Sequence, residues 1–145
     1  MVWKQKLPRS PVGMRAFEAA YAEVERLADL CPTERHLVHS DLLNFNLLIA
    51  NDRVSAVLDW GSSMYGDVLW DLAWFRFWQP WYPAWQAIDF REEALHHAPE
   101  EAHFDARLRC CELCIGVDGL AYQAFRERWD HIEATSRRIF EVLTG

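Results

Sequence analysis

Three polar residues in the middle of the chain have the chemistry of a metal-assisted acid–base site: Asp41, Asn46 and Asp59. Asn46 lies five positions after Asp41, and Asp59 follows thirteen positions later. Amide and carboxylate oxygens are the ligands that suit a hard, water-keeping cation such as Mg²⁺. An Asp that the metal does not need can accept a proton from a substrate hydroxyl. The alternative for each Asp, taken alone, is a residue that only caps a turn.

The elements predicted around these residues favour a shared site. Apolar, β-branched runs at 47–50 and 54–59 flank an Asn-Asp turn, a pattern typical of a β-hairpin. Antiparallel pairing places the outer ends of two strands about 5 Å apart. Asn46 directly precedes the first strand and Asp59 ends the second. We therefore expect their side chains to converge beside Asp41.

Helical periodicity covers most of the remaining chain. Asp67 is placed to cap a helix that begins at Val68 and stops before Pro80. The other expected helices span 14–30, Pro83 to about His97, 104–122 and 129–143. Residues 1–13 are expected to be an irregular lead-in or linker remnant. One helix, a small β element and then further helices predict a mainly helical α+β fold.

The motifs around these residues resemble those of known kinases. His39, Asp41 and Asn46 match the H-x-D-x-x-x-x-N catalytic-loop pattern of protein kinases, and Asp59 matches the Asp of their D-F-G. The segments LVHSD, AVLDW, MYGD, FWQPW and IGVDGL are more similar still to the aminoglycoside phosphotransferase family, especially to its hygromycin-modifying members. The resemblance covers roughly residues 14–143.

The resemblance implies the C-terminal lobe of a kinase-like fold over residues 14–145. It implies transfer of the ATP γ-phosphoryl group to a hydroxyl of an aminoglycoside or similar small molecule. In that reaction Asp41 is the catalytic base, His39 braces the loop, and Asn46 and Asp59 hold Mg²⁺.

Three nearby positions have other implied features. Asp67 and Asp71 have structural roles. Ser40 stands where many relatives have Gly, so an L-residue constrains the backbone there.

One expected part of a kinase is missing from the sequence. Such enzymes cover ATP with a glycine-rich loop and contact its phosphates with a lysine. No glycine-rich loop occurs here, and the chain's lysines, Lys4 and Lys6, precede the first expected helix, at 14–30. We therefore expect the ATP-binding N-terminal lobe to be absent, the ATP site to be incomplete, and the chain alone to be inactive or impaired.

The charge composition indicates which classes of partner the chain can bind. A net charge of −7 argues against nucleic acid, which binds through Lys and Arg, and favours cationic small molecules. Among the acidic residues, Glu112 and Asp118 are candidates to line a cleft. No apolar signal segment is present, and charged and Pro residues interrupt the most apolar stretch, 68–90. We expect a cytoplasmic protein with no membrane association.

Other functions stay open on the sequence alone. A C-terminal lobe retained as a non-catalytic, ligand-binding or self-associating module is the main rival. As a homodimer, or with a missing N-lobe partner, the chain would use the helix at 14–30 and the lead-in carrying Trp3 and Leu7. A metal-dependent phosphohydrolase is less favoured, because no adjacent His-Asp pair or multi-His ligand set appears.

The cysteines and tryptophans also allow two readings. Cys110, Cys111 and Cys114, with the nearby histidines, raise the possibility of zinc. Without a spaced C-x-x-C pair, however, buried reduced cysteines are favoured. The helical spacing of Trp70, Trp74 and Trp78 favours core packing over stacking on sugar rings.

Overall fold

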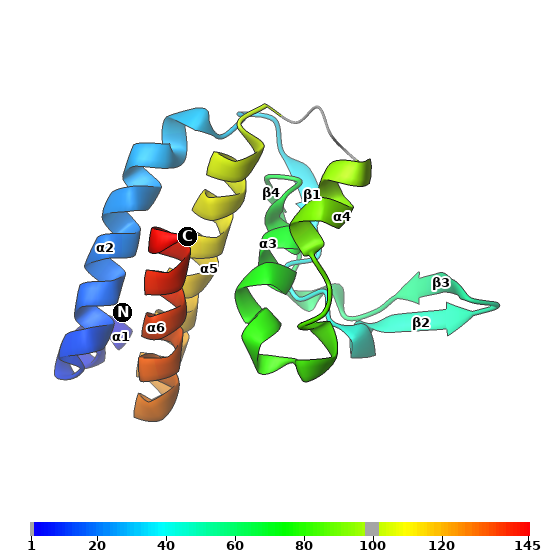
Figure 1. The fold of residues 1–145 in the computed structure, drawn as a ribbon. Coiled ribbons are helices and arrows are strands. Elements are labelled where there is room, and N and C mark those ends of the chain that lie inside the picture. Colours follow the sequence, from blue (N-terminus) through cyan, green and yellow to red (C-terminus); the bar gives the residue numbers. More distant parts are fainter. Residues whose placement is uncertain (1, 98–101) are drawn as a thin grey trace. The chain divides into compact units, whose positions relative to one another are not determined.

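The computed structural model describes residues 2–97 and 102–145, and the described chain divides into two compact units. The first unit combines the two ends of the chain, up to Cys31 and from His103 onward. The second unit is formed by the residues between them. Figure 1 shows the elements of both units.

The first unit is a helical bundle. Its long helices are α2 (Pro11–Leu27), α5 (Phe104–Arg126) and α6 (Trp129–Thr144), and each contacts the other two. Pro11 opens α2 at a position where its missing N–H costs nothing, and the Ser10 side chain accepts a hydrogen bond from Gly13 N–H. The faces that meet carry small and aliphatic side chains, including Ala16, Ala20, Leu108, Leu113, Ile115, Leu120, Ile132 and Ile139.

The lead-in, expected to be irregular, is ordered and helical. It forms the short helix α1 (Trp3–Lys6), followed by a 3-10 turn in which Leu7 is only 1% exposed. Lys6 ties this segment to the end of α5, because its ammonium lies 2.7 Å from the Glu127 carboxylate and donates to the Phe125 carbonyl. The division into a linker and one lobe stays a prediction.

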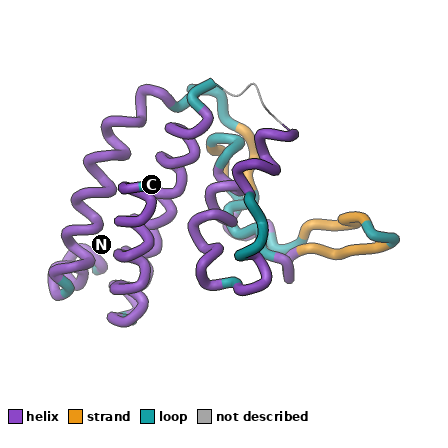
Figure 2. Tube along the Cα trace, viewed as in Figure 1, coloured by secondary structure: helices purple, strands orange, loops and turns teal. Residues whose placement is uncertain are grey.

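Within its described residues, the second unit holds two small antiparallel sheets and two α-helices (Figure 2). Strand β1 (His36–Val38) pairs with β4 (Met64–Gly66), and β2 (Leu47–Ala50) pairs with β3 (Arg53–Val57). The predicted hairpin is confirmed: Ala50 faces Arg53 across a two-residue turn. The mainly helical fold with a small β element is likewise confirmed.

The helices of the second unit are shorter than the sequence predicts. Helix α3 spans Trp70–Trp78, so the helix start expected at Val68 is wrong and Leu69, not Asp67, is the N-cap residue. Asp67 forms the turn before the helix, where its carboxylate accepts the Leu69 N–H. The continuous helix expected from Pro83 to His97 is wrong, since α4 spans only Phe90–His97.

The side chain of Gln79, at the end of α3, explains why no continuous helix runs from Pro83 to His97. The Gln79 amide donates to the carbonyls of Trp85 and Ile88, and Asp89 accepts the first N–H groups of α4. These bonds replace helical ones between Pro83 and α4.

Among the described residues, every helix is too short or too polar to span a membrane.

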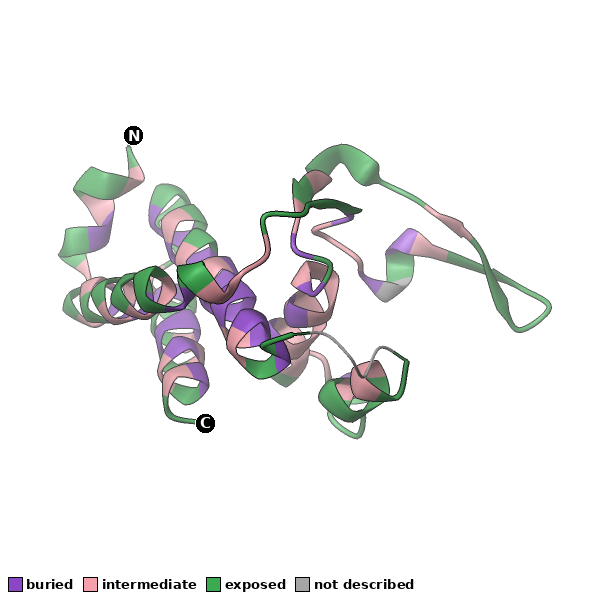
Figure 3. Cartoon of the chain, turned by 90° about the horizontal axis from the view of Figure 1, so that it is seen from above, coloured by how far each residue is buried: buried purple, intermediate pink, exposed green. Residues whose placement is uncertain are grey.

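Burial differs between the two kinds of element. Figure 3 shows buried residues concentrated along the bundle helices, whereas the β2–β3 hairpin is exposed over most of its length. The tryptophan-rich segment packs ring on ring, with Trp78 at 5.8 Å from Trp74 and 5.2 Å from Trp81. Trp70, Trp74 and Trp78, expected to pack in the core, are only half-buried, whereas Trp85 is 8% exposed.

The hairpin turn provides a test of local stability. Asn51 and Asp52 both have positive φ, at 53° and 56°, a pair of values typical of a type I′ turn. Glycine adopts this conformation without the steric cost of a Cβ, so Asp52→Gly should raise the opening free energy of the hairpin amides by about 1 kcal/mol. Asp52→Val should lower it by a similar amount. Hydrogen exchange at 47–50 and 53–57 measures both. Changes of the same sign would contradict this turn geometry.

Candidate active site

His39 connects the start of the candidate loop to the end of the hairpin. It follows β1 directly and is 2% exposed. Its Nε2 lies 2.7 Å from the Leu58 carbonyl, which can only accept, so this nitrogen carries the proton. Its Nδ1 then accepts the Asp41 N–H at 3.3 Å. The ring also meets the Trp60 ring edge-on at 4.9 Å. His39 thus fixes the backbone at Asp41 relative to the residue before Asp59.

The first turn of α3 holds the same loop from another direction. The Asp71 carboxylate accepts two successive backbone N–H groups, from His39 at 2.9 Å and from Ser40 at 2.8 Å. Ser40 has a φ of 65°, a left-handed conformation that costs an L-residue roughly 1–2 kcal/mol. Its hydroxyl accepts the Trp70 indole N–H at 3.1 Å. These bonds hold a loop conformation that its own sequence disfavours.

Asn46 is oriented by three hydrogen bonds and is 8% exposed. Its side-chain amide donates to the Asp41 carbonyl at 2.8 Å. Its backbone N–H donates to the Leu43 carbonyl, and its own carbonyl accepts the Leu58 N–H at 2.8 Å. Because the amide nitrogen is used by Asp41, the amide oxygen is the atom suited to a cation.

Asp59 lies exposed at the matching end of the hairpin. The pairing of Leu47 with Val57, followed by the Asn46–Leu58 bond, brings the two chain segments together there, as the sequence predicts. Asp59 has a φ of 57°, and a side chain at Gly61 would lie 3.3 Å from the Asp59 carboxylate. Glycine therefore leaves the carboxylate unobstructed on that side.

The environment makes Asp41 a stronger base than an ordinary Asp. Burial raises the pKa of the Asp41 carboxyl, the positive charge of the His39 ring in its protonated form lowers it, and the Asp59 carboxylate raises it further. The influence of Asp59 indicates that the two carboxylates act on a common region. The described residues thus bring His39, Asp41, Asn46 and Asp59 together. Their catalytic and metal-binding roles stay predictions.

Other candidates from the sequence lie elsewhere. Glu112 is 3% exposed and lies 3.8 Å from the Arg138 guanidinium, so it is a core residue of the bundle. Asp118 does line a cleft, among residues of α1, α2 and α5. In the described ranges, no three His, Cys, Asp or Glu side chains form a group able to hold a metal ion.

The two hydrogen bonds that the Asp71 carboxylate accepts from His39 and Ser40 form a clamp on the loop, and the sequence does not predict them. The sequence predicts only a structural Asp at this position. Its two partners lie more than thirty residues earlier, so no local pattern links them. The local feature that indicates a need for such bonds is Ser40, an L-residue with a left-handed backbone conformation.

We expect the pKa of Asp41 to depend on the charge of Asp59. Asp59→Asn removes a like charge, so the pKa of Asp41 should fall toward its usual value. Asp52→Asn, a control that neutralises a carboxylate in the hairpin turn, should leave it unchanged. Carboxyl NMR titration measures both. An unchanged Asp41 pKa in Asp59→Asn would show that the two groups do not share a site.

The same raised pKa has a consequence for stability. The stabilisation that protonated Asp41 contributes is fully present below the usual pKa of Asp and is lost as pH rises through the raised value. Asp41→Asn should therefore raise the unfolding temperature relative to wild type more at pH 7 than at pH 3. A difference independent of pH would contradict this assignment.

Removing the Asp71 clamp should loosen the loop selectively. Asp71→Asn replaces one accepting oxygen with a donor, so one charge-assisted bond is lost, worth about 2 kcal/mol. Hydrogen exchange at His39 and Ser40 should accelerate accordingly. Asp89→Asn is the matched control, since Asp89 also accepts two backbone N–H groups but at the start of α4. Equal effects of the two variants at His39 would rule out a specific clamp.

Comparison with known proteins places this geometry in one family. Residues 3–108 match the model of the phosphotransferase enzyme family. The hygromycin-B 4-O-kinase of Escherichia coli is 40% identical over 105 residues, which are 72% of this chain and 30% of that protein.

Solved structures of aminoglycoside phosphotransferase APH(4)-Ia agree. A thermostable mutant in complex with AMP-PNP and hygromycin B matches 98% of this chain with a TM-score of 0.81 and 29% identity. Its apo form gives a TM-score of 0.82 at 30% identity. The chain spans less than half of those proteins, 46% and 47%, and corresponds to their C-terminal lobe. The motif pattern, the mainly helical fold and these matches together establish that the chain belongs to the phosphotransferase enzyme family.

Proposed function

We propose that this chain supplies the catalytic and metal-binding residues of an ATP-dependent phosphotransferase that acts on a hydroxyl of an aminoglycoside. Hygromycin B is the first substrate to test, because it names the related Escherichia coli kinase and is bound in a related structure. The observation that carries the proposal is the bonding of Asn46 to the Asp41 backbone, beside a carboxylate from Asp59.

The proposed roles follow from the chemistry of these groups. Asp41, with its raised pKa, accepts the proton of the acceptor hydroxyl. His39 and Asp71 position the Asp41 backbone and do not touch the substrate. The residues fit Mg²⁺, since Asn46 and Asp59 offer an amide and a carboxylate oxygen. When bound, Mg²⁺ neutralises the negative charge on the phosphate oxygens.

Alanine variants of the solved relatives support the choice of Asp41 and Asn46. In two APH(4)-Ia structures, an aspartate and an asparagine five positions later were each replaced by alanine. Asp41 and Asn46 have this spacing. A third structure replaces the asparagine just before, whereas this chain has Phe45 before Asn46. The first two positions therefore guide the choice of variants here.

We also propose that this chain, acting alone, binds ATP weakly and transfers phosphate at no measurable rate. Lys6 pairs with Glu127 and Lys4 lies over the Trp3 ring, both in the first unit, whereas the candidate site belongs to the second. Phosphoryl transfer depends almost wholly on positioning, which requires nucleotide contacts that the chain does not supply.

A self-associating module is the second candidate function. Large apolar side chains are exposed on and beside the hairpin, including Phe45 at 64%, Ile49 at 62% and Val54 at 57%. An exposed two-stranded edge can pair with another chain. The lead-in is a weaker candidate than the sequence predicts, because Leu7 is buried within its own unit. A homodimer through the hairpin is therefore the form proposed, in a cytoplasmic protein that does not bind nucleic acid.

Isothermal titration with ATP–Mg²⁺ and then with hygromycin B tests the proposed function. We expect weak ATP–Mg²⁺ binding that Asn46→Ala and Asp59→Ala each weaken about tenfold or more, a loss of about 1.4 kcal/mol. Asn51→Gly and Asp52→Gly are matched controls on the same hairpin, since glycine keeps its positive-φ turn, and they should bind as wild type. Equal affinity in all four variants would show that the site assignment is wrong.

A phosphoryl-transfer assay on hygromycin B gives the complementary result. No product is expected from this chain alone. Robust transfer that Asp41→Ala abolishes would overturn the proposed impairment and establish the catalytic role of Asp41 directly.

A further inference from the structure

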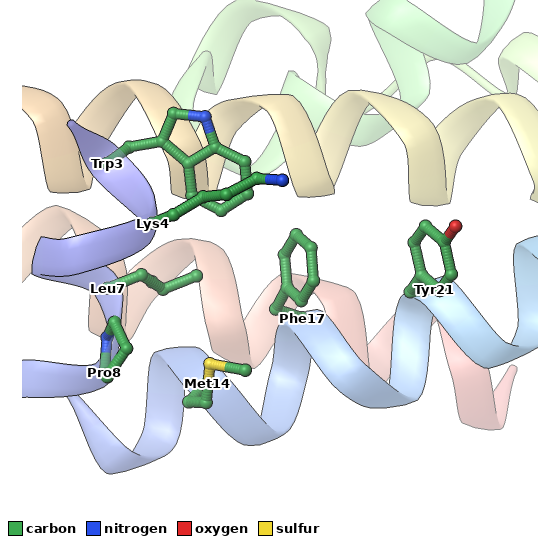
Figure 4. A pocket seen from close by; sticks show the side chains of 7 residues that line it. All are labelled: Trp3, Lys4, Leu7, Pro8, Met14, Phe17 and Tyr21. Carbon is green, nitrogen blue, oxygen red and sulfur yellow. The ribbon is translucent and has the colours of Figure 1, made fainter. Parts of the chain in front are cut away.

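The first unit contains an apolar cleft far in sequence from the candidate active site. Its volume is about 370 Å³, within the range of small-molecule sites, and Figure 4 shows the side chains around it. They come from the lead-in and from α2: Trp3, Lys4, Leu7, Pro8, Met14, Phe17 and Tyr21. The aromatic members form a row, with Phe17 at 5.5 Å from Trp3 and 6.0 Å from Tyr21.

A second cleft of similar volume adjoins the first. Trp3 and Tyr21 line both, so the two clefts share part of a wall. The second is completed by Val24 of α2 and by one face of α5: Cys114, Val117, Asp118 and Ala121. Together they offer a mainly apolar surface, with the Cys114 thiol as the soft nucleophile of the second cleft and the Lys4 amine at the first.

Cys114 belongs to a cluster of four thiols. Cys110 and Cys111 are buried, whereas Cys31 and Cys114 are half-buried. The hydrogen bond from Cys110 holds the pKa of the Cys114 thiol below its usual range. Burial and the nearby Cys111 and Cys31 oppose this shift without reversing it.

The other titratable groups beside Cys114 come from both helices that line the second cleft. They are Asp118 on α5 and Tyr21 on α2. A thiol that is partly accessible and ionises readily is the reactive kind of cysteine.

We propose that Cys114 and the two clefts form a covalent binding site for an apolar, soft electrophile, such as an α,β-unsaturated carbonyl compound with an aromatic body. The Cys114 thiol loses its proton to solvent, and its sulfur adds to the β-carbon of the double bond. A carbon–sulfur bond forms, the π electron pair moves onto the α-carbon and carbonyl, and water protonates the α-carbon. The aromatic body lies against Trp3 and Tyr21. This site is independent of phosphoryl transfer.

N-phenylmaleimide, an unsaturated carbonyl compound with an aromatic ring, is the probe for the wild-type chain. Peptide mass spectrometry gives the modification rate of each cysteine. We expect Cys114 to react about tenfold or more faster than Cys31, its half-buried internal reference. We also expect the preference for N-phenylmaleimide over N-methylmaleimide to be greater at Cys114. Equal rates and equal preferences at the two cysteines would overturn the proposal without any variant.

Matched variants separate the cleft from the thiol. Tyr21→Ala should reduce the N-phenyl preference at Cys114 several-fold. Tyr122→Ala should not, although Tyr122 is equally exposed, at 51%, and lies on α5 outside both clefts. Cys110→Ala should slow modification at pH 7 and shift the pH midpoint upward, whereas Cys111→Ala should not slow it. The Cys31 rate, measured in each variant, reports whether the bundle remains folded. No effect of Tyr21→Ala and Cys110→Ala in folded protein would refute the site.

Discussion

The loop that carries the candidate base depends on one carboxylate at the start of α3. Asp71 accepts the N–H groups of two consecutive residues and, together with the hydrogen bond from Trp70 to the Ser40 hydroxyl, holds Ser40 in a left-handed conformation. The strained residue turns the chain between buried His39 and Asp41. Together with His39 Nδ1, which accepts the Asp41 N–H, this clamp positions the Asp41 carbonyl to which Asn46 donates. The positions of the base and the amide are thus consequences of a bond made from outside the motif.

Local signals in the sequence were sufficient for the hairpin and the grouping of the site. The two strands and their turn follow from alternating apolar runs around Asn51 and Asp52, and pairing then places Asn46 and Asp59 at one end. The ends of α5 and α6 were also predictable to within a few residues, because long amphipathic periodicity is a strong signal. Four of the five segments that carry the family resemblance lie in the second unit, and IGVDGL lies on α5 of the first.

Interactions between distant segments were beyond prediction. The helix expected after Pro83 fails because the Gln79 side chain takes up backbone carbonyls at Trp85 and Ile88, which periodicity does not register. The lead-in looked irregular because its helix is only four residues long, and its order comes from burying Leu7 and pairing Lys6 with Glu127. In each case a tertiary contact overrides what the local composition favours.

The first unit is discontinuous, and this has a consequence for the order of folding. Helix α2 cannot be covered until α5 and α6 exist, and the 71 residues from Pro32 to Ala102 separate them. Closing a flexible loop of that length costs about 4 kcal/mol of chain entropy. The second unit is contiguous and can become compact first, which brings the flanking segments closer before the bundle assembles. During synthesis, the apolar face of α2 therefore stays solvent-exposed until α5 and α6 have left the ribosome, and in that interval it is open to chaperones or misassembly.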